Sequence, residues 1–449
     1  MSTVPSPGSA RAGWRFDNSY ARLPEVFYAR VNPTPVAGPR LVVFNRTLAA
    51  GLGLDPDAVG TPASAALFTG NELPEGAEPI AQAYAGHQFG HFTRLGDGRA
   101  ILAGEQRTPD GRRCDIQWKG AGPTPWSRRG DGRAALGPML REYLVSEAMA
   151  ALGIPTTRSL AVAATGEPVF REQPLPGAVL TRVAASHLRV GTFEYLAARG
   201  DTDALRLLAD HTLRRHYPEQ AEAANPTLAL LEQAVERQAW LVAQWMRVGF
   251  VHGVMNTDNM ALSGETIDYG PCAFLDAYDP GAVFSSIDHQ GRYAFGHQPL
   301  IAAWNLARWA ETLLPLLDDD PQAALEQAQP VVASFPERFQ RHWVDAGRGK
   351  LGLFNAEGGD AALLDDLLAW MQAQGADYTR TFRSLDPAGE PPAPELSGWQ
   401  RRWVERLARQ PQTAREVDAR RRAHNPAVIP RNHAVEAALA DATERADLA

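Results

Sequence analysis

Cysteine is scarce in this chain of 449 residues, which contains only Cys114 and Cys272. Two cysteines are too few for a disulfide scaffold or a cysteine-based zinc site, and they fit a reducing compartment. The chain has no uncharged apolar run of 18 residues, so we expect no bilayer-spanning helix. Its opening, MSTVPSPGSARAGWRF, contains no apolar stretch typical of secretory signals. We therefore expect a cytoplasmic protein without a membrane partner.

Lysine is equally rare, because 42 of the 44 lysine and arginine residues are arginine. The two lysines are Lys119 and Lys350. A lysine retained in so arginine-rich a chain can mark a place that requires a compact ammonium group rather than a planar guanidinium. The formal net charge of −8 argues against nucleic acid as a partner, since nucleic-acid binding normally requires a basic face.

The distribution of residue types predicts four consecutive regions in an α+β protein. Residues 1–80 are interrupted by prolines, and we interpret them as an N-terminal extension packed on the core. Residues 81–185 show strand patterns around one helix, and residues 186–346 are mainly helical. Residues 347–449 form a further helical region.

Local patterns predict the individual elements. Alternating residues over 99–106 and 114–119, separated by the turn signal Pro109-Asp110-Gly111, predict a β-hairpin. Apolar residues at helical spacing predict a helix from Leu136 to Met149. A second hairpin is predicted over 159–163 and 167–171 with Gly166 at its turn, followed by a strand over 178–183. Further helices are predicted over 192–199, 203–216, 228–248, 300–317, 321–346, 361–374 and 397–407.

A glycine-containing segment, Leu95-Gly96-Asp97-Gly98-Arg99, precedes the first of these strands. Gly96 and Gly98 would let backbone amides approach phosphate oxygens, and Arg99 could add a bidentate contact. On its own the pattern is weak, because such a run is more often an ordinary turn.

Lys119 stands on the second strand, 23 residues before Glu142 on the predicted helix. In protein kinases a strand lysine holds the nucleotide phosphates and is oriented by a glutamate of the following helix. The order and spacing fit that arrangement. The alternative is that both residues are exposed and unrelated.

The segment His252-Gly-Val-Met-Asn-Thr-Asp-Asn259 fits the kinase catalytic loop at its first and last residues. Val254 replaces the catalytic aspartate of that loop, and Asp258 is the remaining carboxylate that could act as a base. Asn259, together with Asp268 of Asp268-Tyr-Gly, supplies oxygen ligands of the kind that Mg²⁺ prefers. The alternative is a solvent-facing turn rich in Asp and Asn.

Several long motifs together resemble the selenoprotein O family (SelO, also called YdiU), in order along the chain from about Phe16 to Leu353. The motifs are FDNSYARLPEVFYARVNPTPV, YAGHQFGHF, LGDGRA, DIQWKGAGPTPWSRRGDGRA, HGVMNTDNMAL and IDYGPCAFLDAY. The resemblance implies a two-lobed protein-kinase-like fold, with the N-terminal extension and additional C-terminal helices around it. It also implies transfer of AMP from ATP to Ser, Thr or Tyr hydroxyls of protein substrates, with ATP bound in a flipped orientation.

The resemblance further implies roles for particular residues. Asn259 and Asp268 would bind magnesium, or manganese in its place. Asp258 would accept the proton of the acceptor hydroxyl, and Glu142 would pair with Lys119. Nucleotide binding would fall on Gly96, Gly98, Arg99, Lys119, Asp131, Gly132, Arg182, Arg189 and Asp268. Members often carry selenocysteine or cysteine near the C-terminus, whereas no cysteine follows Cys272 here, so redox control by such a residue is in doubt.

Two other functions compete with AMP transfer. One is an ordinary phosphotransferase, against which Val254 argues because it cannot accept a proton. The other is a non-catalytic nucleotide-binding scaffold, against which the retention of Lys119, Glu142, Asn259 and Asp268 argues.

Four other features favour structural interpretations. His87 and His91 have a spacing that could bind zinc on a helix, but Gly86 and Gly90 make loop packing the better interpretation. Trp118 and Trp126 are expected to pack in the core rather than stack on a base. Cys272 is expected to be a buried apolar residue. The cluster 420–422, three consecutive arginines, is expected to be a solvated helix face.

Overall fold

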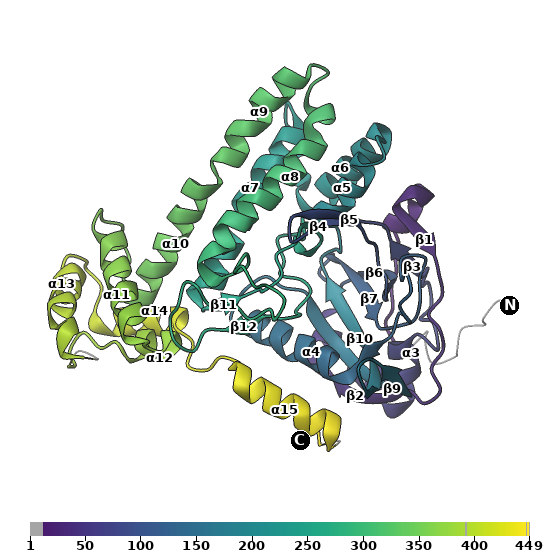
Figure 1. Cartoon of the computed structure of the whole chain (residues 1–449), viewed down its shortest axis with the longest axis horizontal. Coiled ribbons are helices and arrows are strands. Elements are labelled where there is room, and N and C mark those ends of the chain that lie inside the picture. Colours follow the sequence, from purple (N-terminus) through teal and green to yellow (C-terminus); the bar gives the residue numbers. More distant parts are fainter. Residues whose placement is uncertain (1–11, 391–392, 446, 449) are drawn as a thin grey trace.

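An antiparallel sheet lies beside a large group of helices in the computed structural model, which describes residues 12–390, 393–445 and 447–448 (Figure 1). The chain is therefore α+β, as predicted. The first eleven residues of the expected N-terminal extension lie outside the described residues.

The main sheet contains the predicted hairpin, which is formed by β6 (Ala100–Arg107) and β7 (Arg113–Lys119). Lys119 pairs with Ala100, so the end of β7 lies beside the glycine-containing segment that precedes β6. The other strands are β1 (Tyr28–Arg30), β3 (Ile80–Gln82), β9 (Arg158–Phe170), β10 (Pro174–Ala184), β2 (Arg40–Phe44) and the short β8 (Ala134–Ala135). Their order is β1-β3-β6-β7-β10-β9-β2, with β8 paired to β10.

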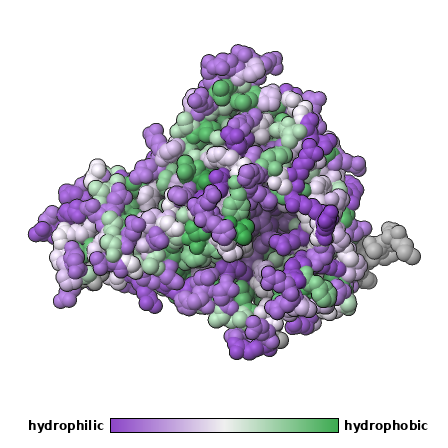
Figure 2. Space-filling view, viewed as in Figure 1, coloured by the Kyte–Doolittle hydropathy of each residue, from purple (hydrophilic) through white to green (hydrophobic). Residues whose placement is uncertain are grey.

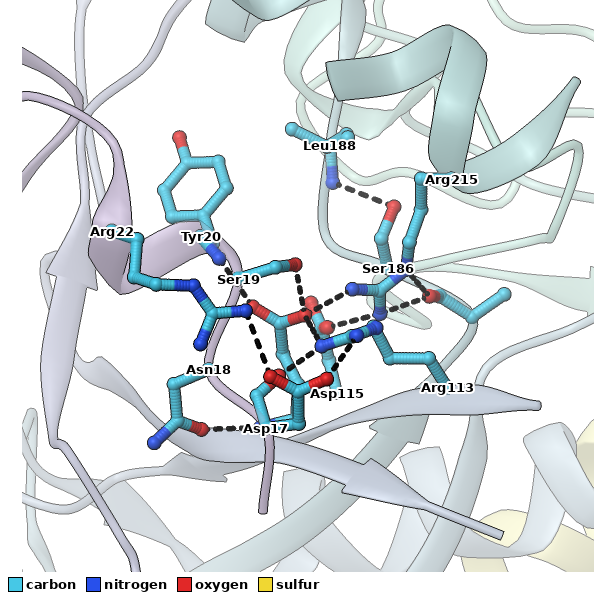
Figure 3. A network of polar contacts seen from close by, with 12 residues as sticks. Asp17, Asn18, Ser19, Tyr20, Arg22, Arg113, Asp115, Ser186, Leu188 and Arg215 are labelled. Atoms are coloured by element: carbon cyan, nitrogen blue, oxygen red, sulfur yellow. Dashed lines mark hydrogen bonds and ion pairs between the residues drawn. The ribbon is translucent and has the colours of Figure 1, made fainter. Parts of the chain in front are cut away.

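The proline-interrupted N-terminal segment supplies both edges of this sheet. Strand β1 pairs with β3 at one edge, and β2 pairs with β9 at the other. Residues before β1 join a polar network with the sheet (Figure 3). In it the Ser19 hydroxyl donates to Glu105 Oε2 at 2.6 Å, and Arg113 contacts Asp17. Arg215 of α6 (Thr202–His216) enters the same network by donating to Asp115 Oδ1 at 2.7 Å. The network therefore ties the extension, the sheet and the helical part together.

The second predicted hairpin, with its turn at Gly166, is wrong. Residues 158–170 form one strand, β9, and the turn to β10 lies after Phe170. Gly166 has φ +75° and marks a register shift in the pairing with β10, so it forms a bulge rather than a turn. A Cβ atom at Gly166 would meet the backbone of Gly38 at 2.8 Å. The absence of a side chain at Gly166 thus allows the two backbones to approach closely.

Helix α4 (Leu136–Ala151) packs on β9 and β10, and it matches the predicted helix closely. The C-terminal helix α15 (Asn432–Glu444) packs on α4 through Val435 and Leu439 (Figure 1). Further α-helices are α5 (Val190–Ala197), α7 (Pro226–Arg247), α8 (Gln298–Leu317), α11 (Asp360–Gln374), α12 (Tyr378–Ser384), α13 (Ser397–Leu407) and α14 (Ala414–His424).

The single helix predicted over residues 321–346 is wrong, because the structure divides it into α9 (Pro321–Ala333) and α10 (Phe335–Leu351). Pro336 is the second residue of α10 and has no amide hydrogen to continue the hydrogen bonding of α9. Helices α12 and α15 were not predicted individually, and of α14 only the helix face at residues 420–422 was expected.

The core contains most of the residues that the sequence assigns to it. Trp118 is buried in the sheet, and both cysteines are buried as free thiols. Burial raises the pKa of Cys114 to about 11 and that of Cys272 to about 12. Within the described residues, no helix combines the length and apolarity needed to cross a bilayer. Hydrophilic residues cover most of the face in Figure 2, with hydrophobic ones in scattered patches.

Candidate active site

A cavity of about 320 Å³ lies where the end of β7 meets the loop that contains residues 254–271. It brings together nine of the twelve residues predicted for the site, from segments that are far apart in the sequence. These are Gly98, Arg99, Lys119, Glu142, Arg182, Arg189, Asp258, Asn259 and Asp268.

Lys119 lines this cavity and is only 8 % exposed. Its Nζ lies 2.7 Å from Glu142 Oε2 and 2.8 Å from Asp268 Oδ1. The structure thus contains the expected ion pair between β7 and α4. Burial and the nearby Arg182 charge lower the pKa of Lys119, while the two carboxylates oppose that change.

Two buried arginines complete the cationic cluster around Asp268. Arg182 of β10 donates from Nε to Glu142 Oε1 at 2.8 Å and from Nη2 to Asp268 Oδ1 at 2.6 Å. Arg189, at the start of α5, donates from Nη1 to Asp268 Oδ2 at 2.7 Å. Both oxygens of Asp268 therefore accept hydrogen bonds from cations.

These cations determine the protonation of the two central carboxyl groups. Burial alone would raise the pKa of Asp268, but Arg182, Lys119 and Arg189 hold it well below its ordinary value. Burial is likewise outweighed at Glu142, whose pKa is lowered by Arg182 and Lys119. Both groups are therefore carboxylates at neutral pH.

The backbone at Asp268 is unusual. Its φ of +63° lies in the left-handed region, which non-glycine residues rarely adopt. The Gly270 amide donates to the Asp268 carbonyl oxygen at 2.9 Å and closes a tight turn. A conformation of this kind costs about 1–3 kcal/mol and persists where surrounding contacts enforce it. Here it directs the carboxylate at the three cations.

Asp258 differs from Asp268 because neither of its carboxylate oxygens forms an ion pair with a cation of the described residues. It is 8 % exposed and lines the cavity, while its Oδ1 is sealed from solvent without a hydrogen-bond partner. Burial raises the pKa of Asp258 to about 6. The carboxylate is therefore available as a proton acceptor, and Val254, at the position of the kinase base, is apolar.

The segment that carries Asp258 is fastened to its surroundings. His252 Nε2 lies 2.9 Å from the Ile267 carbonyl oxygen, and the Asn259 amide donates to the Val254 carbonyl oxygen at 2.9 Å. The second of these bonds uses Nδ2 and leaves the Asn259 side-chain oxygen free to act as a ligand.

A hairpin of β4 (Ala85–Gln88) and β5 (His91–Arg94) packs on this segment. The His87 amide donates to Thr257 Oγ1 at 2.7 Å, and the Thr257 hydroxyl donates to Glu194 Oε2 at 2.6 Å. His87 Nδ1 lies 2.6 Å from Glu194 Oε1. His87 thus has a packing role, as expected, although it lies in a strand and not in a loop.

The donor set of the cavity suits a hard divalent cation. Asp268, Asp258 and Asn259 all offer oxygen ligands of the type that magnesium prefers, and the Asn259 side-chain oxygen is not used by the bond that its amide makes to Val254. In the part of the chain that the structure describes, no cluster of three or more His, Cys, Asp and Glu residues suits a metal. A magnesium ion here would thus depend on the asparagine and on additional oxygens from a bound ligand.

Three predicted residues do not line the cavity. Gly96 has φ +104°, and a Cβ atom there would lie 2.4 Å from the Trp126 ring, so its visible role is to pack against that ring. Asp131 is exposed and pairs with Arg171 at 2.9 Å. Gly132 has φ +66° and packs against the backbone of Gly122. A nucleotide role for these three residues remains a prediction.

Among the lining residues that were not predicted for the site are Asp97 and Tyr84. Asp97 is 2 % exposed, and burial raises its pKa to about 6. The Tyr84 ring lies under the Arg189 guanidinium, whose carbon is 4.6 Å from the ring centroid. Both residues belong to motifs quoted from the sequence, Asp97 to LGDGRA and Tyr84 to YAGHQFGHF, in which the glycines and histidines were given the roles.

Comparison with known proteins gives a consistent result. The sequence model described as Protein adenylyltransferase SelO matches residues 11–449. A Protein nucleotidyltransferase YdiU from Shouchella clausii is 61 % identical over 443 residues, which cover 97 % of this chain and 91 % of that protein. Proteins of the same name from Syntrophotalea carbinolica and Rhizobium etli are each 60 % identical, covering 97 % of this chain and 89 % and 90 % of their own lengths.

Proposed function

Because the chain belongs to the SelO family and is a nucleotidyltransferase, we propose that it transfers AMP from ATP to Ser, Thr or Tyr hydroxyls of protein substrates, using Mg²⁺ or Mn²⁺. The observation that carries this proposal is the asymmetry of the cavity. Three cations gather around Asp268, while the Asp258 carboxylate forms no ion pair within the part of the chain that the structure describes.

The charges in the cavity favour a nucleotide that arrives with a metal. The cavity is lined by equal numbers of cations and carboxylates. The four cations are Arg99, Lys119, Arg182 and Arg189, and the four carboxylates are Asp97, Glu142, Asp258 and Asp268. This balance leaves no excess positive charge for a triphosphate, which carries about four negative charges. A divalent cation would supply the missing charge, and Asp268 and Asn259 would hold it.

In the proposed reaction, Asp258 removes the proton from the acceptor hydroxyl of the protein substrate. The hydroxyl oxygen forms a bond to the α-phosphorus of ATP. The bond between the α-phosphorus and the oxygen that bridges it to the β-phosphorus breaks. Pyrophosphate leaves with the bonding electron pair. Negative charge thus develops on the β- and γ-phosphates, where Lys119, Arg182 and Arg189 provide positioned cations. Bound magnesium would further stabilise this charge as a Lewis acid.

Phosphotransfer and a nucleotide-binding scaffold are the two alternative functions. Each can be distinguished from AMP transfer by which phosphate of ATP, if any, labels the protein product. The purified protein is incubated with a generic protein acceptor and either α-³²P-ATP or γ-³²P-ATP. AMP transfer labels protein from the α-phosphate only, and Val254 in place of the kinase base favours this result. Label from the γ-phosphate would show phosphotransfer. Binding of ATP with no label transferred to acceptor or enzyme would instead support a nucleotide-binding scaffold.

A further inference from the structure

A second cavity, in the C-terminal helical region, has no part in the site above. It has a volume of about 710 Å³ and lies between α12, α13 and α14. None of its lining residues lines the cavity around Lys119. Its volume is within the range of sites that bind small molecules.

Arg421 is the unusual feature of this cavity. The sequence predicts a solvated helix face over residues 420–422, but the structure corrects this, because Arg421 is only 5 % exposed. Its Nε has no hydrogen-bond partner in the described part of the chain. The nearest carboxylate oxygen belongs to Asp418, 3.7 Å from Nη1, and that carboxylate is closer to Arg422, at 2.6 Å from Nε.

A buried guanidinium without a close counter-ion is energetically unfavourable, and buried charges in proteins are normally paired. The Trp403 ring offers only partial compensation, since its centroid is 5.5 Å from the Arg421 guanidinium carbon. The arginine stem packs against the residue that follows α10, because a Cβ atom at Gly352 would lie 3.0 Å from Arg421 Cγ. The charged group is therefore buried and incompletely paired.

The remaining lining residues define the ligand chemistry. Three arginines, Arg383, Arg421 and Arg422, face two carboxylates, Asp386 and Asp418, so one positive charge is in excess. This excess matches a monoanion better than a polyphosphate. Leu385, Val404, Leu407 and Val417 form an apolar wall beside the charges.

We propose that this cavity binds a small amphipathic monocarboxylate, with its carboxylate at Arg421 and its apolar part against Val404 and Val417. Such a ligand supplies the missing counter-ion and covers Val404, which is 38 % exposed. The same chemistry is offered by a free alkyl carboxylate and by the C-terminus of a peptide that ends in an apolar residue.

The test is isothermal titration calorimetry of the full chain with octanoate and with N-acetyl-leucine. Octan-1-ol provides the apolar part without the charge, and acetate provides the charge without the apolar part. We expect saturable binding of at least one of the first two ligands below about 10 mM, and binding at least about tenfold weaker for both reference compounds. The tighter of octanoate and N-acetyl-leucine identifies the source of the carboxylate.

Two pairs of variants locate the binding. Arg421→Gln should weaken binding about tenfold or more, whereas Arg401→Gln, at an exposed position on α13, should not. If Arg421→Gln does not fold, Val404→Glu provides a second test, because it adds a like charge at the cavity rim. Its control is Val428→Glu, at a position that is 81 % exposed. Absence of saturable binding, or equal binding by Val404→Glu and wild type, overturns the proposal.

Discussion

Gly86 lies directly against Asp258, so that a Cβ atom at residue 86 would be 2.2 Å from Asp258 Oδ1. This contact shields Oδ1 of the Asp258 carboxylate from solvent, although the residue also lines the cavity. The hairpin that carries Gly86 is tied to the neighbouring Thr257 by the His87 amide at 2.7 Å. The hairpin therefore fixes the position of the proposed proton acceptor.

Gly86→Ala should lower the turnover number by at least about tenfold, because the added methyl group must displace the carboxylate. ATP affinity should change little, since the cationic cluster around Asp268 is untouched. Both are measured with α-labelled ATP and by calorimetry. Gly51→Ala is the matched control, because nothing lies within 4 Å of a Cβ atom there. Unchanged turnover in Gly86→Ala would show that the position of Asp258 is unimportant.

Asp258→Asn should lower turnover by roughly two to four orders of magnitude, the usual contribution of a positioned general base. The substitution keeps the shape of the side chain, so the packing against Gly86 is preserved. Nucleotide affinity should be maintained, because Arg189 contacts only the backbone oxygen of Asp258, at 2.8 Å, and the substitution leaves that oxygen in place. A joint loss of ATP affinity and turnover would instead assign Asp258 to metal binding or to structure.

Asp268→Ala should abolish transfer and remove the effect of Mg²⁺ on ATP affinity, because it deletes the charged member of the proposed metal-binding pair. It also leaves Lys119, Arg182 and Arg189 without their shared carboxylate, so metal-free ATP should still bind. Calorimetry with and without Mg²⁺ measures both effects. Full activity at low millimolar Mg²⁺ would refute this role.

Lys119→Arg preserves the charge but should reduce activity by about 10²-fold. The lysine amine fits between two carboxylate oxygens at 2.7 and 2.8 Å in a buried position, where Arg182 already contacts both carboxylates. A second guanidinium is too large for that space. Thermal unfolding identifies a variant that fails to fold, and near wild-type activity of a folded variant would contradict the expectation.

Glu265→Gln should change how stability depends on pH. Burial raises the pKa of Glu265 to about 7, so between its ordinary value and pH 7 the folded chain binds a proton that the unfolded chain has released. Ionisation therefore destabilises the fold as pH rises. Relative to wild type, the variant should gain roughly 1–3 kcal/mol in unfolding free energy from pH 4.5 to pH 8. Urea denaturation at both values measures this, and parallel pH profiles would argue against it.

Elements whose pattern is local were predictable. The β6–β7 hairpin has its own turn signal, and α4 has a regular apolar spacing, so neighbouring residues determine both. Gly166 was misread because a bulge and a turn use the same residue type. Its bulge depends on the distant Gly38, whose backbone lies against it. The edge strands β1 and β2 likewise exist only through pairing with β3 and β9.

In the candidate site, too, the residues with a local pattern were predictable, and those that depend on distant contacts were not. Lys119, Glu142 and Asp268 were identifiable because their types and spacing match a known arrangement, and the structure brings them together. Tyr84 was missed because its contact with Arg189 joins residues 105 positions apart, and no local pattern indicates such a contact. Arg421 was assigned to a solvated face because its burial depends on the distant residues Gly352 and Trp403.

The burial of both lysines has a practical consequence for chemical labelling. Lys350 is 1 % exposed, with its amine donating to the Arg247 carbonyl oxygen at 2.8 Å, and Lys119 opens only into the cavity. Amine-directed acylation and cross-linking therefore have no lysine target on the outer surface, whose positive charge comes from arginine. An acyl-phosphate derivative of a nucleotide would instead be expected to modify one lysine, Lys119, and a single modified peptide would report on occupancy of the cavity.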